Sequence, residues 1–138
     1  MQICHEIRDS TPEVGVGIFA KESVPVGTLI WKFIEGENVI IYDKKSAEDH
    51  LSRYQTLKEA QRWLDIAYGA NGMLCVITDV GRNMNHSPTP NCKTTSNGDV
   101  YSIKNIAIGE ELYEDYASFG KLLCIYEKSV FNIFIIYM

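Results

Sequence analysis

Cysteine is scarce and scattered in this chain of 138 residues. The four cysteines, Cys4, Cys75, Cys92 and Cys124, lie far apart and form no C-x-x-C pair. This spacing argues against a zinc site with paired ligands and against the disulfide framework of a small secreted domain, so we expect no metal. Because no basic and apolar leader opens the chain, we expect reduced thiols in an intracellular protein, whether nuclear or cytoplasmic.

Long hydrophobic runs and an excess of positive charge are also missing. No run approaches the ~20 apolar residues that cross a membrane, and the most apolar stretch, residues 130–138 ("VFNIFIIYM"), is only long enough for a buried strand. Lys and Arg number 13 against 18 Asp and Glu, which gives a net charge of −5. We therefore expect no membrane and no direct nucleic-acid contact, but a basic protein or peptide as partner. The sequence leaves open whether the chain forms a homo-oligomer.

The first forty residues are rich in short β-type segments. Strands are predicted within residues 1–7, 14–20, 28–33 and 38–42, separated by proline and glycine turn signals. β-character returns in residues 73–79 ("MLCVITD"). The dipeptide Asn97-Gly98 then predicts a tight hairpin between residues 93–96 and 99–104.

Between these β-rich parts the hydrophobic period changes. Thr56 and Glu59 form a capping box, and apolar residues from Leu57 to Tyr68, Ala67 among them, recur at helical spacing. Ser46 with Asp49 marks the start of a shorter helix before it. We therefore predict one α+β domain, mostly β, over residues 1–138, with a helical insertion at about 46–68 and a C-terminal tail at about 121–138.

A polar stretch in the second half, "GRNMNHSPTPNC", places Asn85, His86 and Ser87 side by side just before Pro88 and Pro90. The prolines keep it from being regular helix or strand, and taken alone the composition is typical of a loop. A hydrolase that uses Ser87 with His86 is disfavoured, because neighbouring residues rarely present both side chains to one point and no G-x-S-x-G motif is present.

Three segments in a fixed order carry a family resemblance: "GVGIFA" at 15–20, "RNMNHSPTPN" at 82–91 and "GEELYEDY" at 109–116. In this order they resemble the SET-domain family of protein lysine methyltransferases, over about residues 2–120. The resemblance implies small curved β-sheets around a knot-like core, in which the N-H-S segment threads through the loop before a catalytic tyrosine. It also implies methyl transfer from S-adenosylmethionine to a protein lysine, with a histone as one candidate target.

The resemblance makes Tyr116 the catalytic residue, whose hydroxyl lies near the migrating methyl. The cofactor-binding residues that the resemblance implies are Gly15, Val16, Gly17, Arg82, Asn85 and His86. Taken singly, each of these residues and Tyr116 has a plainer interpretation as part of a β-bulge, a turn, a core histidine, a surface charge or a half-buried strand aromatic. Glu110 and Glu111 are interpreted as a turn into the last core strand, one of them paired to a basic residue, rather than as catalytic acids.

Three departures from the family pattern leave a second interpretation open. A tyrosine that commonly lines the site after the third strand is replaced by Ile34, or by Phe33 if the register shifts by one. Pro88 replaces a cysteine of the zinc-binding post-SET type, which indicates a small free-standing SET protein without that segment. Glu114 stands where the family commonly has Phe or Tyr, and would bind the substrate lysine or point to solvent. The alternative function is a catalytically silent SET-like module that binds a peptide or protein.

Overall fold

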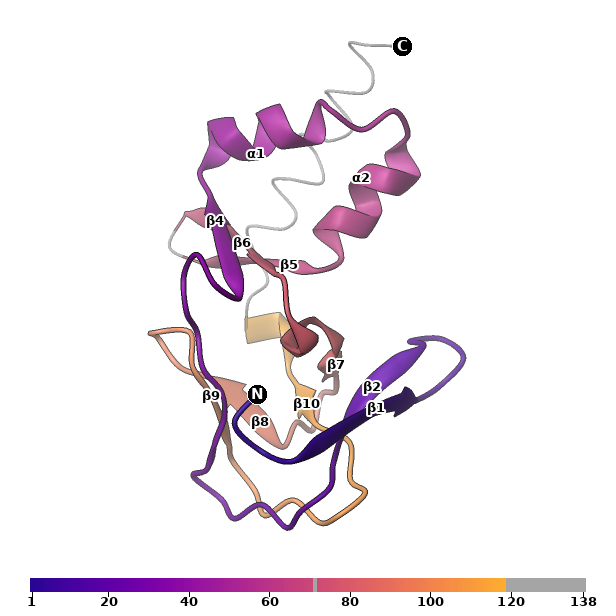
Figure 1. Cartoon of the computed structure of the whole chain (residues 1–138), viewed down its shortest axis with the longest axis vertical. Coiled ribbons are helices and arrows are strands. Elements are labelled where there is room, and N and C mark those ends of the chain that lie inside the picture. The colour runs from indigo at the N-terminus through magenta and orange to yellow at the C-terminus, as the bar shows by residue number, and fades with distance from the viewer. Residues whose placement is uncertain (71, 119–138) are drawn as a thin grey trace. The chain divides into compact units, whose positions relative to one another are not determined.

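A computed structural model of the chain describes residues 1–70 and 72–118 (Figure 1). They divide into two compact units, which are described separately: unit 1 contains Met1–Ile34 and Val80–Tyr116, and unit 2 contains Glu35–Asp79 with residues 117–118. The predicted tail at 121–138, with its apolar stretch and Cys124, lies outside the described residues. No helix in the described part of the chain is long and apolar enough to cross a membrane.

Unit 1 is made of short strands in small sheets, with the 3-10 helix η1 (Val80–Asn83) before the polar stretch. A second 3-10 helix, η2 (Tyr116–Ser118), begins at the last residue of this unit. The strands β1 and β2 pair antiparallel, β3, β9 and β8 form a three-stranded sheet in that order, and β7 pairs parallel with β10. The strands of unit 1 are β1 (His5–Asp9), β2 (Val16–Ala20), β3 (Leu29–Trp31), β7 (Asn85–His86), β8 (Cys92–Thr94), β9 (Val100–Ser102) and β10 (Tyr113–Glu114).

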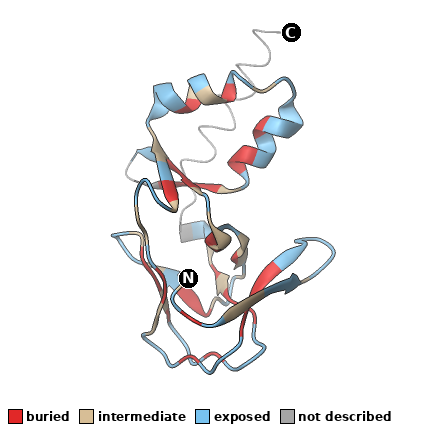
Figure 2. Ribbon diagram, in the orientation of Figure 1, coloured by how far each residue is buried: buried red, intermediate tan, exposed pale blue. Residues whose placement is uncertain are grey.

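The core of unit 1 joins these small sheets through aliphatic side chains. Ile18, Ile30 and Leu112 are fully buried, and Figure 2 shows such buried residues on several short segments of this unit. Arg8 connects β1 to its neighbours in two ways. Its guanidinium lies 3.9 Å from the centre of the Phe19 ring in β2, and it donates to the Gly109 carbonyl at 2.9 Å. The prediction of a mostly-β α+β fold built from small sheets is confirmed.

The hairpin predicted at Asn97-Gly98 connects β8 and β9 as expected. Gly98 has a φ of +91°, which glycine adopts without strain, and its N–H donates to the Thr95 carbonyl at 3.0 Å. The Phe33 ring lies directly over this glycine, and the Phe33 N–H donates to Asp99 Oδ1 at 2.9 Å. Phe33 is therefore part of the packing of this hairpin.

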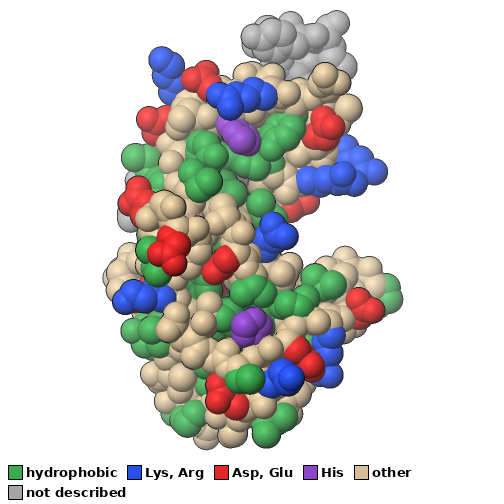
Figure 3. Space-filling view, viewed as in Figure 1, with side chains coloured by type: hydrophobic (Ala, Val, Ile, Leu, Met, Phe, Trp, Pro, Cys, Tyr) green, Lys and Arg blue, Asp and Glu red, His purple; other side chains and the backbone are tan. Residues whose placement is uncertain are grey.

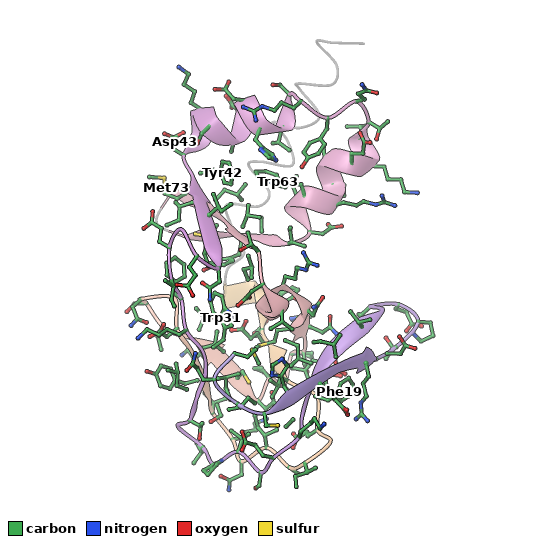
Figure 4. All side chains as sticks on the ribbon, in the orientation of Figure 1. Phe19, Trp31, Tyr42, Asp43, Trp63 and Met73 are labelled. Carbon is green, nitrogen blue, oxygen red and sulfur yellow. The ribbon has the colours of Figure 1, made fainter. Side chains whose placement is uncertain are left out.

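Unit 2 packs two helices on a three-stranded antiparallel sheet of order β4–β6–β5. Figure 4 shows Tyr42 and Trp63 between the sheet and the helices, where their rings meet edge to face at 5.1 Å, and the His50 ring stacks on Trp63 at 4.4 Å. The elements of unit 2 are β4 (Val39–Tyr42), α1 (Lys44–Leu51), α2 (Leu57–Leu64), β5 (Ala67–Ala70) and β6 (Met73–Ile77).

The structure corrects several predicted boundaries. Helix α2 begins with the predicted capping box but ends at Leu64, so Ala67 and Tyr68 belong to strand β5, where Tyr68 pairs with Cys75. Their apolar spacing fits a helix, but pairing with β6 decides their conformation, and this contact is invisible to local periodicity. Helix α1 is capped by Asp43 rather than by Ser46, whose N–H donates to Asp43 Oδ1 at 2.8 Å.

The first strand is also displaced from its predicted range. It runs from His5 to Asp9 rather than over residues 1–7, and its register is fixed by β2, with Ile7 opposite Ile18. The Gln2 N–H instead donates to the Ile30 carbonyl at 2.8 Å, which ties the beginning of the chain to β3. Strand pairing therefore sets this boundary rather than the β-propensity of the first residues.

Candidate functional site

The polar stretch singled out in the sequence lies beside the segment that leads into Tyr116. Strands β7 and β10 pair in parallel, so that Asn85 is opposite Tyr113 and His86 is opposite Glu114. The Ser87 N–H extends this pairing by donating to the Glu114 carbonyl at 2.9 Å. Two motifs almost thirty residues apart are thereby brought together within unit 1.

Tyr116 is attached to the polar stretch at both ends. Its hydroxyl donates to the Met84 carbonyl, and its backbone N–H donates to His86 Nδ1 at 3.0 Å. The Tyr116 and His86 rings lie 5.3 Å apart, tilted against each other. These contacts fix both the backbone and the phenol of Tyr116 relative to residues 84–86.

The phenol of Tyr116 keeps its proton at neutral pH. Although the residue as a whole is 46% exposed, partial burial of the phenol, reinforced by the nearby Glu114 carboxylate, raises the pKa of Tyr116 to about 12. Low polarity and a neighbouring negative charge both disfavour a phenolate. Tyr116 is therefore unsuited to act as a general base and suited to offer a neutral hydroxyl whose oxygen retains lone pairs.

The Asn85 side chain has a defined orientation. Its Nδ2 donates to the Val16 carbonyl at 3.0 Å and to Glu111 Oε1 at 2.8 Å. Both partners are acceptors only, so the amide nitrogen must face them and the carbonyl oxygen Oδ1 must face away. No described residue donates to Oδ1, and the half-buried side chain leaves this oxygen available to a ligand.

His86 is exposed and its tautomer follows from its partner. Nδ1 accepts a hydrogen bond from the Tyr116 N–H, so a neutral imidazole carries its proton on Nε2. Asp115 Oδ1 lies 3.6 Å from the same Nδ1. In the neutral state His86 therefore offers a ligand one N–H donor.

The two predicted glycines serve different purposes in the fold. Gly15 has a φ of +78° in the turn between β1 and β2, where its N–H donates to the Thr11 carbonyl at 2.8 Å, and an added Cβ would meet nothing within 4 Å. At Gly17 an added Cβ would lie 2.7 Å from Glu111 Cδ and 3.1 Å from Asn85 Nδ2. The missing side chain at Gly17 thus makes room for groups of the protein itself.

These contacts bring most of the predicted cofactor-binding residues together. Val16 and Gly17 lie against Asn85, and His86 follows directly in β7. Arg82 is exposed on η1 and forms no hydrogen bond or ion pair with a described residue, so its contact with a cofactor stays a prediction.

Glu111 is a site residue that the sequence reasoning missed. Its carboxylate is buried and accepts hydrogen bonds from side chains, and no basic residue in the described part of the chain forms an ion pair with it. The expected turn at Gly109 and Glu110 is present, because the Glu110 N–H donates to the Ala107 carbonyl at 3.0 Å. No local signal in "GEEL" distinguishes the buried glutamate from the exposed one.

Glu114 does not point to solvent, which excludes one of its two predicted roles. The residue is only 9% exposed, and its carboxylate accepts a hydrogen bond from the Thr94 hydroxyl. Burial raises the pKa of the Glu114 carboxyl, although the Thr94 hydrogen bonds act in the opposite direction. A charged Glu114 therefore costs free energy in the folded protein.

Glu114→Gln is expected to stabilise the protein at neutral pH and to leave its stability unchanged in acid. A raised folded-state pKa means that the carboxyl favours folding most below its unfolded pKa of about 4.3 and loses this contribution as pH rises through the folded pKa. The melting temperature of the variant should match wild type below pH 4 and exceed it at pH 7. Glu37→Gln, at an exposed position, serves as control. Equal or lower stability of Glu114→Gln at pH 7 would contradict this account.

The family model for the SET domain matches residues 15–117, whereas no curated protein sequence matches the chain. Among solved structures, a candidate histone methyltransferase of Plasmodium falciparum is 18% identical with a TM-score of 0.54, covering 84% of this chain and 95% of that one.

Larger assemblies contain the same fold. The structure of ctPRC2 in an autoinhibited conformation bound to S-adenosylmethionine is 16% identical with a TM-score of 0.67, covering 93% of this chain and 17% of that one. A humanized mutant of the Chaetomium thermophilum Polycomb Repressive Complex 2 bound to the inhibitor GSK126 is 19% identical with a TM-score of 0.60, covering 88% and 16%. The chain spans less than a fifth of these Polycomb chains, and at such identities the likeness concerns the fold.

Proposed function

Because the chain belongs to the SET-domain family and has a SET-type methyltransferase fold, we propose that it transfers a methyl group from S-adenosylmethionine to a lysine of a protein. The observation that carries the proposal is the attachment of Tyr116 to residues 84–86 through both its hydroxyl and its N–H. This contact supports the proposal because it joins Tyr116, the proposed catalytic residue, to the strand proposed to bind the cofactor.

The chemistry of the available groups fits the amino-acid part of S-adenosylmethionine. Asn85 Oδ1 is an acceptor without a described donor, which suits an ammonium group. The His86 Nε2–H and the exposed guanidinium of Arg82 are donors, which suit a carboxylate. These three residues would hold the cofactor, while Gly17 would act indirectly by making room for Asn85.

The reaction needs alignment rather than a strong base. S-adenosylmethionine supplies a methyl group on a positively charged sulfur, and the lysine amine forms the C–N bond as the C–S bond breaks and its electron pair stays on sulfur. The lysine ammonium group must first lose a proton to water, because only the neutral amine has a free lone pair. Tyr116, whose proton is held toward the Met84 carbonyl, would direct its oxygen lone pairs to the polarised methyl C–H groups.

A basic protein or peptide is the proposed substrate. The net charge of −5 favours a positively charged partner, and on the face drawn in Figure 3 the Lys and Arg side chains are scattered rather than gathered into a stripe that would follow a nucleic-acid backbone. Since the name of one structural relative refers to a histone methyltransferase, histones are the first substrates to test.

A silent binding module is the second candidate function. It is favoured by the absence of a tyrosine at residues 33 and 34, and the structure uses Phe33 to cover Gly98 rather than leaving it available to a substrate. Such a module would bind a peptide or protein without turnover. Transfer of label from the cofactor distinguishes the two functions.

The test is to incubate the protein with methyl-labelled S-adenosylmethionine and core histones, and to locate the label by mass spectrometry. The proposal predicts label on lysine side chains that depends on the enzyme and is absent when histone lysines are chemically blocked. Cofactor binding without any labelled histone or other basic protein would favour the silent module.

A further inference from the structure

Glu111 is a buried carboxylate that accepts hydrogen bonds from three parts of the chain. It is 7% exposed, and Asn85 Nδ2 donates to its Oε1 at 2.8 Å. The hydroxyls of Ser10 and Tyr113 donate to the other oxygen, Oε2, at 2.7 and 2.6 Å. A carboxylate taken out of water needs such donors, and here all three are neutral. The arrangement therefore fixes both carboxylate oxygens.

The backbone that carries this carboxylate is fixed as well. Glu111 forms a β-bridge with Phe19, and the next residue, Leu112, donates its N–H to the Ile18 carbonyl at 2.8 Å. On the other side, Asn91 Nδ2 donates to the Glu111 carbonyl at 2.8 Å. The Glu111 side chain thus starts from an anchored position and fills the space that Gly17 leaves open.

Glu111 decides which way the Asn85 amide faces. If the amide were turned over, Oδ1 would face the Val16 carbonyl oxygen and the Glu111 carboxylate oxygen. Three acceptor oxygens would then lie next to one another with no hydrogen to form a hydrogen bond. In the observed orientation both N–H groups are used and Oδ1 faces away. Without the carboxylate, only the Val16 carbonyl would oppose a reversed amide.

We propose that Glu111 is a positioning residue that sets Asn85 Oδ1 toward the ligand and thereby makes the site selective for a ligand with an ammonium group. The inference rests on the proposed function and specifies an ammonium as the ligand group that the site recognises. Glu111 itself touches no substrate in this account, and it acts through Asn85.

The test compares S-adenosylmethionine with the analogue in which hydrogen replaces the α-amino group, using calorimetric dissociation constants. Wild type should prefer the amino ligand about tenfold to hundredfold, as expected for a hydrogen bond to a charged group. Glu111→Met, which keeps side-chain length but removes both acceptors, should reduce this preference to less than about threefold. Glu111→Gln, whose amide oxygen can still accept from Asn85, should retain most of it.

Tyr113→Phe is the matched control, because it removes a donor from Glu111 but leaves the Asn85 contact in place. It should keep the wild-type preference. If Glu111→Met weakens both ligands by the same factor, Glu111 is only structural and the proposal is overturned.

A second measurement does not depend on any ligand or on the folding of a variant. In the free wild-type protein, the two Asn85 side-chain amide protons should exchange with water at least about tenfold more slowly than those of Asn105, whose side chain forms a described hydrogen bond only through its oxygen. Equal exchange rates would overturn the proposed orientation. If wild type binds neither ligand while Asn85 is protected, the proposed function fails but the positioning by Glu111 stands.

Discussion

Tyr116→Phe should reduce the rate of methyl transfer at least about a hundredfold while changing the affinity for S-adenosylmethionine less than about threefold. The expected loss of rate is comparable to that from removing one preorganised hydrogen-bonding group from an active site. The phenylalanine ring can keep its contact with His86, and the backbone N–H of residue 116 still donates to His86 Nδ1. The hydroxyl and its hydrogen bond to the Met84 carbonyl are lost. The effect should therefore fall on the chemical step.

Single-turnover transfer of labelled methyl measures that step directly. Tyr101→Phe is a suitable control, because this tyrosine also lies in unit 1, on β9, but away from the β7–β10 pair. The Tyr116 variant should lose only about 1 kcal/mol of stability from the missing hydrogen bond, so a folded protein is expected. Wild-type transfer rates in Tyr116→Phe would exclude Tyr116 as the catalytic residue.

Gly17→Ala should destabilise the protein by roughly 3–5 kcal/mol, which combines overpacking with the loss of hydrogen bonds to a buried carboxylate. The new methyl would lie 2.7 Å from Glu111 Cδ, and Glu111 is held in place by Ser10, Asn85 and Tyr113. Since the clash involves an anchored side chain, it cannot be relieved by turning an exposed group toward water. A fall in melting temperature of ten degrees or more is expected.

Gly15→Ala is the matched control for this experiment. It lies two residues away with a positive φ but has open space around the added methyl, so it should cost only about 1 kcal/mol. Urea unfolding of both variants separates the two effects, and Gly17→Ala combined with Glu111→Ala should regain part of the lost stability. If Gly17→Ala costs no more than Gly15→Ala, the close packing at Gly17 is not important for stability.

Features of the fold that depend on neighbouring residues were predictable from the sequence. The Asn97-Gly98 hairpin and the capping box of Thr56 and Glu59 both form, because each is specified within a few residues. The end of α2 was not predictable in this way. Ala67 fits the helical spacing but pairs with Val76 in β6, a contact that only the folded sheet provides.

In the candidate site, too, the motifs could be recognised from the sequence, whereas the burial of individual side chains could not. The order of the motifs indicated the family and the importance of Asn85, His86 and Tyr116, which the structure brings together in and beside β7. The burial of Glu111 and Glu114 could not be read from "GEELYEDY", because their donors Ser10 and Thr94 come from distant segments.

The most direct test of the central claim is a calorimetric titration of the whole chain with S-adenosylmethionine, compared with Asn85→Ala. The account predicts one site in wild type and at least about tenfold weaker binding in the variant, which loses the Oδ1 acceptor for the ammonium group. Lys58→Ala, at an exposed position in α2, should bind as wild type does. An absence of binding to the folded wild-type protein at millimolar cofactor, or unchanged affinity in Asn85→Ala, would contradict the proposed site.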